Sequence, residues 1–223
     1  MQIQAVQLPG RDLGALQAFY RDVLGLTTER SGTRLSVQVG RSRLEFREGE
    51  VAGGAHLAFD IPTNQVAEAQ HWLEERTALL AEEGQTCFFS EGWNASMVYL
   101  LDPEGNVLEL IARHTRDNAS AAAFGPECLL SISEVGLPVQ DVPAATTTLG
   151  RALGLTPYLG GSETFQPVGD HHGLLILVRE GRPWFPTDTA ARLLPTDIQL
   201  QAPVPGTLEL PGTPYRLTSS PAG

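Results

Sequence analysis

An internal repeat constrains the fold of this chain more than any other feature. The segment LPGRDLGALQAFYRDVLGL (8–26) aligns with LPVQDVPAATTTLGRALGL (137–155), and Leu-Pro, one Asp and a closing Leu-Gly-Leu coincide at an offset of 129 residues. In each copy the Asp is placed to cap a helix, and the Gly suits the left-handed conformation that ends one. The chain is therefore predicted to consist of repeated units that open with a strand and a helix.

Further strands are predicted after each helix. LSVQVG and SRLEFRE alternate apolar and polar residues around a glycine turn after the first copy, and ETFQPVG and GLLILVRE do the same after the second. A weaker copy spans 55–80, and a fourth, starting near DIQLQ (197–201), shows strands but no helical period. Because short Gly-bearing turns suit antiparallel neighbours better than crossovers, these strands are expected to pair mainly antiparallel.

A polar and then small-residue stretch separates the two halves of the chain. It reads RHTRDNASAAAFGPE (113–127), which has the composition of a linker. We therefore predict a first domain at 1–114 with two units, a linker at 115–128, and a second domain at 129–223 with one full unit and a truncated unit of strands only.

Composition narrows the classes of partner. The formal net charge of -11 repels phosphates, which argues against nucleic acids and anionic membrane surfaces. No apolar run is long enough to span a bilayer, and the first residues lack the layout of an export signal, so a cytoplasmic location is expected. The two cysteines, Cys87 and Cys128, are far apart and in no metal-type spacing, so both are interpreted as inert thiols.

Two motifs resemble a known superfamily. The pattern DLxxxxxFYxxxLGL (12–26) and the segment DPEGNVLEL (102–110) are similar to those of the vicinal oxygen chelate superfamily, which includes glyoxalase I, fosfomycin and bleomycin resistance proteins, and extradiol dioxygenases. The resemblance covers 1–114 well and 129–203 more loosely. It implies an α+β fold of tandem βαβββ units, with curved, mainly antiparallel sheets and helices on the outside. Two units of such a fold close a U-shaped sheet around a divalent metal.

The resemblance also implies site residues. His56 matches the ligand that opens the second unit, and Glu109 matches the carboxylate on its last strand, where a catalytic role also falls. The position that opens the first unit is Ala5, which cannot bind a metal. Gln7, on the same strand face, and Glu45, at the end of the first unit, are the candidates to complete the ligand shell.

Other residues are assigned by their place near this site. Glu134 lies where a ligand would open the third unit, but Leu177 is expected where its partner carboxylate belongs, so no second metal site is predicted. Trp93 and Asn94 in EGWNAS, an aromatic beside an amide, are expected to line the mouth of a cavity and bind a substrate. Tyr99 is expected beside Glu109, because a buried charge needs a partner. Tyr99 and Gln7 are also assigned to substrate binding.

Two functions follow from these assignments. The first is a metal-dependent enzyme of glyoxalase or dioxygenase type, which holds Zn, Fe, Mn or Ni and acts on a small molecule with vicinal oxygens. The alternative is a non-catalytic protein that sequesters a small molecule and carries a degenerate metal site, as bleomycin resistance proteins do. In both cases the chain is expected to be a monomer or a homodimer.

Overall fold

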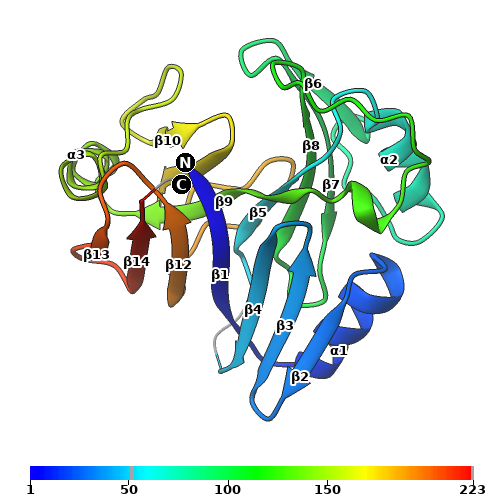
Figure 1. Ribbon diagram of the computed structural model, residues 1–223, viewed down its shortest axis with the longest axis horizontal. Helices are drawn as coiled ribbons and strands as arrows, with labels where there is room; N and C mark the ends of the chain where they lie inside the picture. The colour runs from blue at the N-terminus through cyan, green and yellow to red at the C-terminus, as the bar shows by residue number, and fades with distance from the viewer. Residues whose placement is uncertain (51–52, 222–223) are drawn as a thin grey trace.

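The computed structural model describes residues 1–50 and 53–221, which form two seven-stranded sheets (Figure 1). The sheet orders are β13-β14-β12-β1-β4-β3-β2 and β10-β11-β9-β5-β8-β7-β6. Four of the six strand pairings in each sheet are antiparallel and two are parallel, so the predicted mainly antiparallel α+β class is confirmed. The elements are β1 (Gln2–Gly10), α1 (Leu13–Ala18), a π-helical turn (Phe19–Val23), β2 (Thr28–Ser31), β3 (Arg34–Val39), β4 (Ser42–Glu48), β5 (His56–Asp60), α2 (Val66–Glu74), β6 (Cys87–Ser90), β7 (Ala95–Leu101), β8 (Val107–Arg113), a 3-10 turn (Pro126–Cys128), β9 (Ser131–Val139), α3 (Val142–Leu153), β10 (Phe165–Asp170), β11 (Gly173–Arg179), β12 (Thr196–Gln201), β13 (Gly206–Glu209) and β14 (Tyr215–Ser220).

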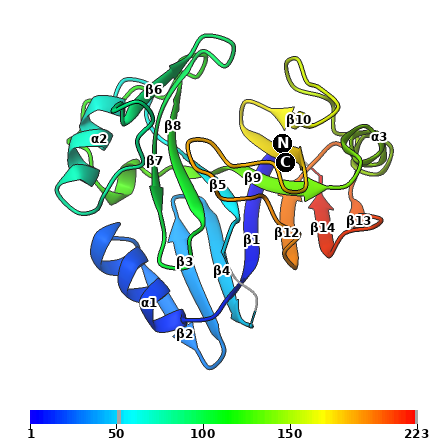
Figure 2. The same ribbon diagram turned by 180° about the vertical axis from the view of Figure 1, so that it is seen from behind.

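The helices begin and end where the repeat places its signals. The Asp12 carboxylate accepts hydrogen bonds from the backbone N–H groups of Gly14 and Ala15, and Asp141 caps α3 in the same way through Ala144. Gly154 ends α3 with a φ of 69°, a conformation that costs little only without a Cβ. The three helices lie on the outer sides of the sheets, with α3 on one flank and α1 and α2 on the other (Figures 1 and 2).

The sheets do not follow the two halves of the sequence. β1 of the first unit pairs with β12 of the fourth, and β5 of the second unit pairs with β9 of the third, both antiparallel. The expectation that the first two units close one sheet around a site is therefore corrected, since each sheet combines one unit from either half. The segment between β8 and β9 packs on the first half, because Asn118, Ser120 and Ala122 bond to the loop at 63–65.

The third and fourth units are reduced relative to the first. In the third unit two strands follow α3 instead of three, which shortens the full unit expected there. Within the described residues the fourth unit has three strands and no helix. No helix of the described segments combines the length and the apolar character needed to cross a lipid bilayer.

Candidate functional site

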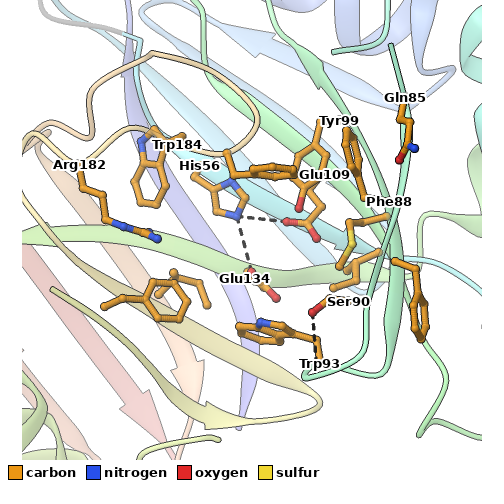
Figure 3. A pocket seen from close by; sticks show the side chains of 16 residues that line it. His56, Gln85, Phe88, Ser90, Trp93, Tyr99, Glu109, Glu134, Arg182 and Trp184 are labelled. Atoms are coloured by element: carbon orange, nitrogen blue, oxygen red, sulfur yellow. Dashed lines mark hydrogen bonds and ion pairs between the residues drawn. The ribbon is translucent and has the colours of Figure 1, made fainter. Parts of the chain in front are cut away.

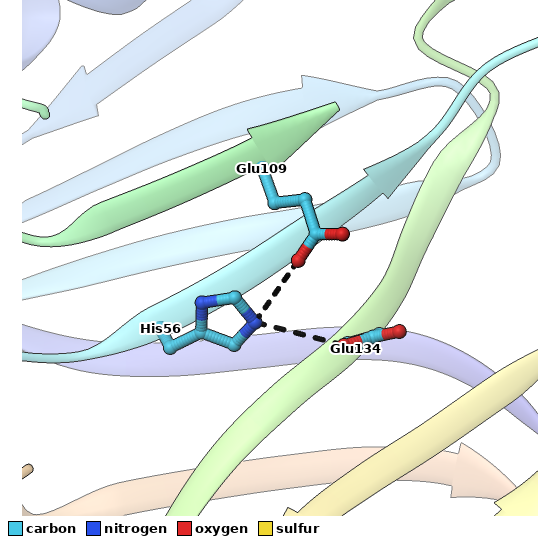
Figure 4. Close-up of side chains that lie close together, drawn as sticks. All are labelled: His56, Glu109 and Glu134. Atoms are coloured by element: carbon cyan, nitrogen blue, oxygen red, sulfur yellow. Dashed lines mark ion pairs between the residues drawn. The ribbon is translucent and has the colours of Figure 1, made fainter. Parts of the chain in front are cut away.

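Three buried side chains from three neighbouring strands converge on the concave side of the second sheet. His56 on β5 places its Nε2 3.4 Å from Glu109 Oε2 on β8 and 3.6 Å from Glu134 Oε2 on β9. One nitrogen or oxygen of each residue lies within 4.8 Å of the others, and the side chains are 5–8% exposed (Figure 4). His56 and Glu109 therefore face one another as the sequence suggested, and Glu134 joins them.

Strand register explains why these three residues meet. Ala58 pairs with Glu109 on one side and with Glu134 on the other, so that both carboxylates flank the same small residue. His56 lies two residues before Ala58 and so points to the same face of the sheet. A methyl group at position 58 leaves room above the strand for the three longer side chains.

The guanidinium of Arg113 contacts this group of acids. Buried Arg113 donates through Nη2 to Glu134 Oε1 and through Nη1 to the Ser133 hydroxyl at 3.1 Å. Asp60, the next acid in the network, pairs with Arg116 at 2.7 Å. Arg113 therefore occupies one oxygen of Glu134 and leaves Oε2, the oxygen that faces His56, available.

Glu109 has no arginine partner of its own among the described residues. Burial, together with the negative charge of Glu134, raises the pKa of Glu109 well above its usual range, and Arg113 and Tyr99 offset this only in part. Burial and the Glu109 charge likewise raise the pKa of the Tyr99 phenol. The site therefore holds one negative charge more than its own cations neutralise, which favours the uptake of a proton or of a metal cation.

The imidazole of His56 is held by an aromatic neighbour. The Trp184 ring stacks on it with centroids 5.1 Å apart and planes 23° apart, and the Trp184 indole N–H donates to the Gly54 carbonyl at 2.8 Å. Nδ1 of His56 is buried and has no partner within the described residues. The stack therefore fixes the ring in the orientation that directs Nε2 at the two carboxylates.

The donor set fits a divalent transition metal. One imidazole nitrogen and two carboxylate oxygens are ligands that Zn, Fe, Mn and Ni accept. Three protein ligands leave at least one coordination position open, which is the arrangement of catalytic rather than structural sites. The Arg113–Glu134 contact has the form of the outer hydrogen bonds that orient a ligating carboxylate.

The cluster lies at the base of a pocket of about 390 Å³, a size that suits a small molecule (Figure 3). Trp93 and Tyr99 line the pocket as predicted, but Asn94 does not. Asn94 is exposed in a turn with a φ of 45°, and its carbonyl accepts from His114, so the cavity role expected for its amide is corrected. The lining residues are His56, Gln85, Phe88, Phe89, Ser90, Trp93, Met97, Tyr99, Glu109, Ile111, Glu134, Phe165, Ile176, Arg182, Trp184 and Phe185.

Comparisons with known proteins agree with this architecture. Residues 5–111, a little under half of the chain, match the model of the glyoxalase-like domain family. No curated protein matches the sequence. Glyoxalase I from Zea mays superposes with a TM-score of 0.60 at 13% identity and covers 99% of this chain and 92% of its own. A proposed dioxygenase from Bacillus subtilis superposes with a TM-score of 0.62 at 14% identity and covers 100% and 86%.

The chain has the vicinal oxygen chelate fold. The resemblance inferred from the motifs is thereby confirmed. In this vicinal oxygen chelate fold each of the two sheets has its own concave side, and the predicted ligands are distributed between them.

Glu45 and Gln7 lie in the other sheet. They line a separate pocket of about 330 Å³ with Ala5, where Gln7 donates to Asp197 at 2.9 Å and Glu45 pairs with Arg43 at 2.6 Å. The structure therefore does not bring them to His56, and the expectation that either completes its ligand shell is wrong.

The third carboxylate comes from Glu134, which corresponds to Ala5 at the repeat offset of 129. The sequence predicts Leu177 at the position of a partner carboxylate for Glu134, and therefore no metal site there. The register shows that Ile176, which pairs with Gly136, faces the pocket, whereas Leu177 lies in the main core. Glu134 completes the cluster because β9 joins β5, a pairing between units that no local pattern signals.

Three further pocket residues come from one loop of the second half. Arg182, Trp184 and Phe185 belong to GRPWFPT (181–187). This loop joins the two halves of the chain, since the Trp184 indole N–H donates to the Gly54 carbonyl and Phe185 packs edge-on against Phe88 with centroids 5.0 Å apart. Its two aromatics and its arginine were the available signal for a binding role.

Proposed function

We propose that this protein is a metal-dependent enzyme that acts on a small molecule with neighbouring oxygens. His56, Glu109 and Glu134 would hold the divalent cation. The observation that carries this proposal is the buried cluster of one imidazole and two carboxylates at the base of a pocket of about 390 Å³. Among the described residues, Arg113 alone contacts this cluster with a guanidinium. The glyoxalase-like match over 5–111 supports the same general function.

A bound divalent metal would supply a Lewis acid that stabilises negative charge on a substrate oxygen, an effect worth several kcal/mol. Arg113 keeps one oxygen of Glu134 directed at the site, and Trp184 keeps the imidazole oriented. Glu109 is proposed as a catalytic group as well as a ligand, because its carboxylate lines the pocket, pairs across the strands with Tyr99 and lies 3.4 Å from His56 Nε2. The aromatic walls around the cluster exclude water and so strengthen each of these electrostatic contacts.

Metal analysis of protein purified without chelator tests the proposal. About one equivalent of Zn, Fe, Mn or Ni is expected, with loss of the metal in His56→Ala and Glu134→Gln. Glu45→Gln is the matched control, because it removes a carboxylate of the same kind from the other sheet and should keep the metal. Absence of metal from the unmodified protein, even after soaking in each ion, would overturn the proposal.

A metal-free binding protein is the second candidate, and one observation favours it. Ile176 faces the pocket at the position that corresponds to Glu109 in the neighbouring unit. An apolar side chain therefore stands where a further metal ligand could have been. Thermal-shift measurements with small aromatic compounds test this reading, since a ligand selective for the folded state raises the melting temperature by mass action. A shift that is the same with and without metal supports sequestration. No shift at millimolar ligand contradicts it. The cytoplasmic location and the monomeric or dimeric state stay predictions.

A further inference from the structure

The pocket above the cluster has walls suited to a flat ring. Phe88, Tyr99 and Phe185 contact one another edge to face, with centroids 5.0–5.7 Å apart. On another side Trp93 and Phe165 contact each other, with centroids 6.4 Å apart. These side chains come from β6, β7, β10 and the 91–94 and 181–187 loops, so both halves of the chain contribute to the walls. Aromatic rings that present faces and edges to a cavity favour an aromatic occupant over a flexible polar one.

Among the described residues that line this pocket there is one arginine and no lysine, and this arginine lies at the rim. The Arg182 guanidinium lies 4.9 Å from the centroid of Phe165, and its side chain is directed toward the pocket (Figure 3). Within the described part of the chain no carboxylate lies within 4.0 Å of it, although the protein carries a formal net charge of -11. Arg182 is the only lysine or arginine among the described residues that line the pocket. An exposed guanidinium held over an aromatic ring is free to pair with an anion.

The pocket therefore carries acidic groups at its base and a basic group at its rim. Its base presents an imidazole and two carboxylates, and its rim presents one unpaired guanidinium. We infer that its ligand is an aromatic compound with neighbouring oxygens at the cluster end and one anionic group that pairs with Arg182. This assignment rests on the proposed function for the cluster end only. A peptide thiol such as glutathione, with two carboxylates and an ammonium group, finds one free cation here and does not match this lining.

A pair of ligands that differ only in charge isolates the role of Arg182. We would titrate metal-free protein with 4-nitrophenylacetate and with 4-nitrophenylacetamide and follow tryptophan fluorescence. Trp93 and Trp184 line the pocket, and Trp72 packs elsewhere against Phe124, so a nitroaryl ligand quenches the first two. The acid is expected to bind about tenfold more tightly than the amide, the worth of one charge-assisted hydrogen bond. Arg182→Gln should abolish this preference.

Arg179→Gln is the matched control. It removes the same charge from an exposed side chain three residues away that does not line the pocket, so the preference for the acid should remain. Equal binding of acid and amide by the unmodified protein, or an unchanged preference in Arg182→Gln, would overturn the inference, as would tighter binding of S-benzylglutathione than of the aryl acid.

The outcomes keep this inference and the metal proposal apart. Because the titration uses metal-free protein, a preference for the acid that depends on Arg182 supports the ligand class even if metal analysis finds no ion. Conversely, one equivalent of metal together with equal binding of acid and amide would support the metal site and reject the anion contact.

Discussion

Gly136 on β9 lies next to both the Trp184 ring and His56, so a substitution there tests whether Trp184 packing orients His56. A Cβ added at this position would lie 2.5 Å from Cη2 and 2.8 Å from Cζ2 of Trp184, and 3.0 Å from Cβ of His56. Real Cβ atoms essentially never approach other heavy atoms closer than 3.0 Å. The backbone of Gly136 does not adopt a positive φ, so alanine would strain packing and not the main chain. The substitution Gly136→Ala therefore displaces either the indole or the strand.

The loss of stability expected for Gly136→Ala follows from the contacts of the Trp184 indole. Overpacking a filled site costs about 1–3 kcal/mol. If the Trp184 ring moves away, its hydrogen bond to the Gly54 carbonyl is lost as well, which costs about 1 kcal/mol. We therefore expect Gly136→Ala to lower the free energy of unfolding by about 2–4 kcal/mol. Each kcal/mol lowers the melting temperature of a chain of this size by about 2–4 °C.

Urea denaturation of metal-free protein, followed by far-UV circular dichroism, measures this cost. Gly206→Ala is the control, because a Cβ at Gly206 meets no atom within 4 Å and its φ is not positive. That change should be neutral or stabilise by up to about 1 kcal/mol. If Gly136→Ala unfolds at the same urea concentration as Gly206→Ala, then Gly136, His56 and Trp184 do not pack as closely as described. In that case Trp184 does not orient His56.

Three further perturbations test the charges and caps. In metal-free protein, the raised pKa of Glu109 means that stability falls as the pH rises above about 4.3, where the unfolded side chain ionises first. Glu109→Gln should weaken this fall, as urea midpoints at pH 5 and pH 8 would show; parallel pH profiles would contradict it. Arg113→Met leaves Glu134 buried without its partner and should cost about 3–5 kcal/mol in urea unfolding, whereas a loss below about 1 kcal/mol would show the ion pair to be dispensable. Asp12→Ala removes a cap that accepts two backbone hydrogen bonds and should cost about 1 kcal/mol by the same measurement, and no change would contradict the capping role.

The fold could be predicted from the sequence because its signals are local. Asp12 and Asp141 mark helix starts, Gly154 marks a helix end, and two-residue alternation marks the strands, and each of these features is decided by the backbone within a few residues. The order of strands in the sheets is not decided that way. Nothing near β5 indicates that it pairs with β9 of the other half rather than with β1, since either choice buries the same apolar faces.

That choice of partner also explains why the ligand set expected from the sequence is incomplete. Ala5 counted against a metal site as long as its strand was expected to border β5. In the structure β1 borders β12, and the residue that faces His56 is Glu134, the equivalent of Ala5 in the third unit. Ala5 therefore lines the pocket of the other sheet, with Gln7 and Glu45. Its lack of a donor atom has no bearing on the cluster at His56. A repeat with four units can lose ligands in one sheet and keep them in the other, because each unit contributes its opening strand to only one of the two concave faces.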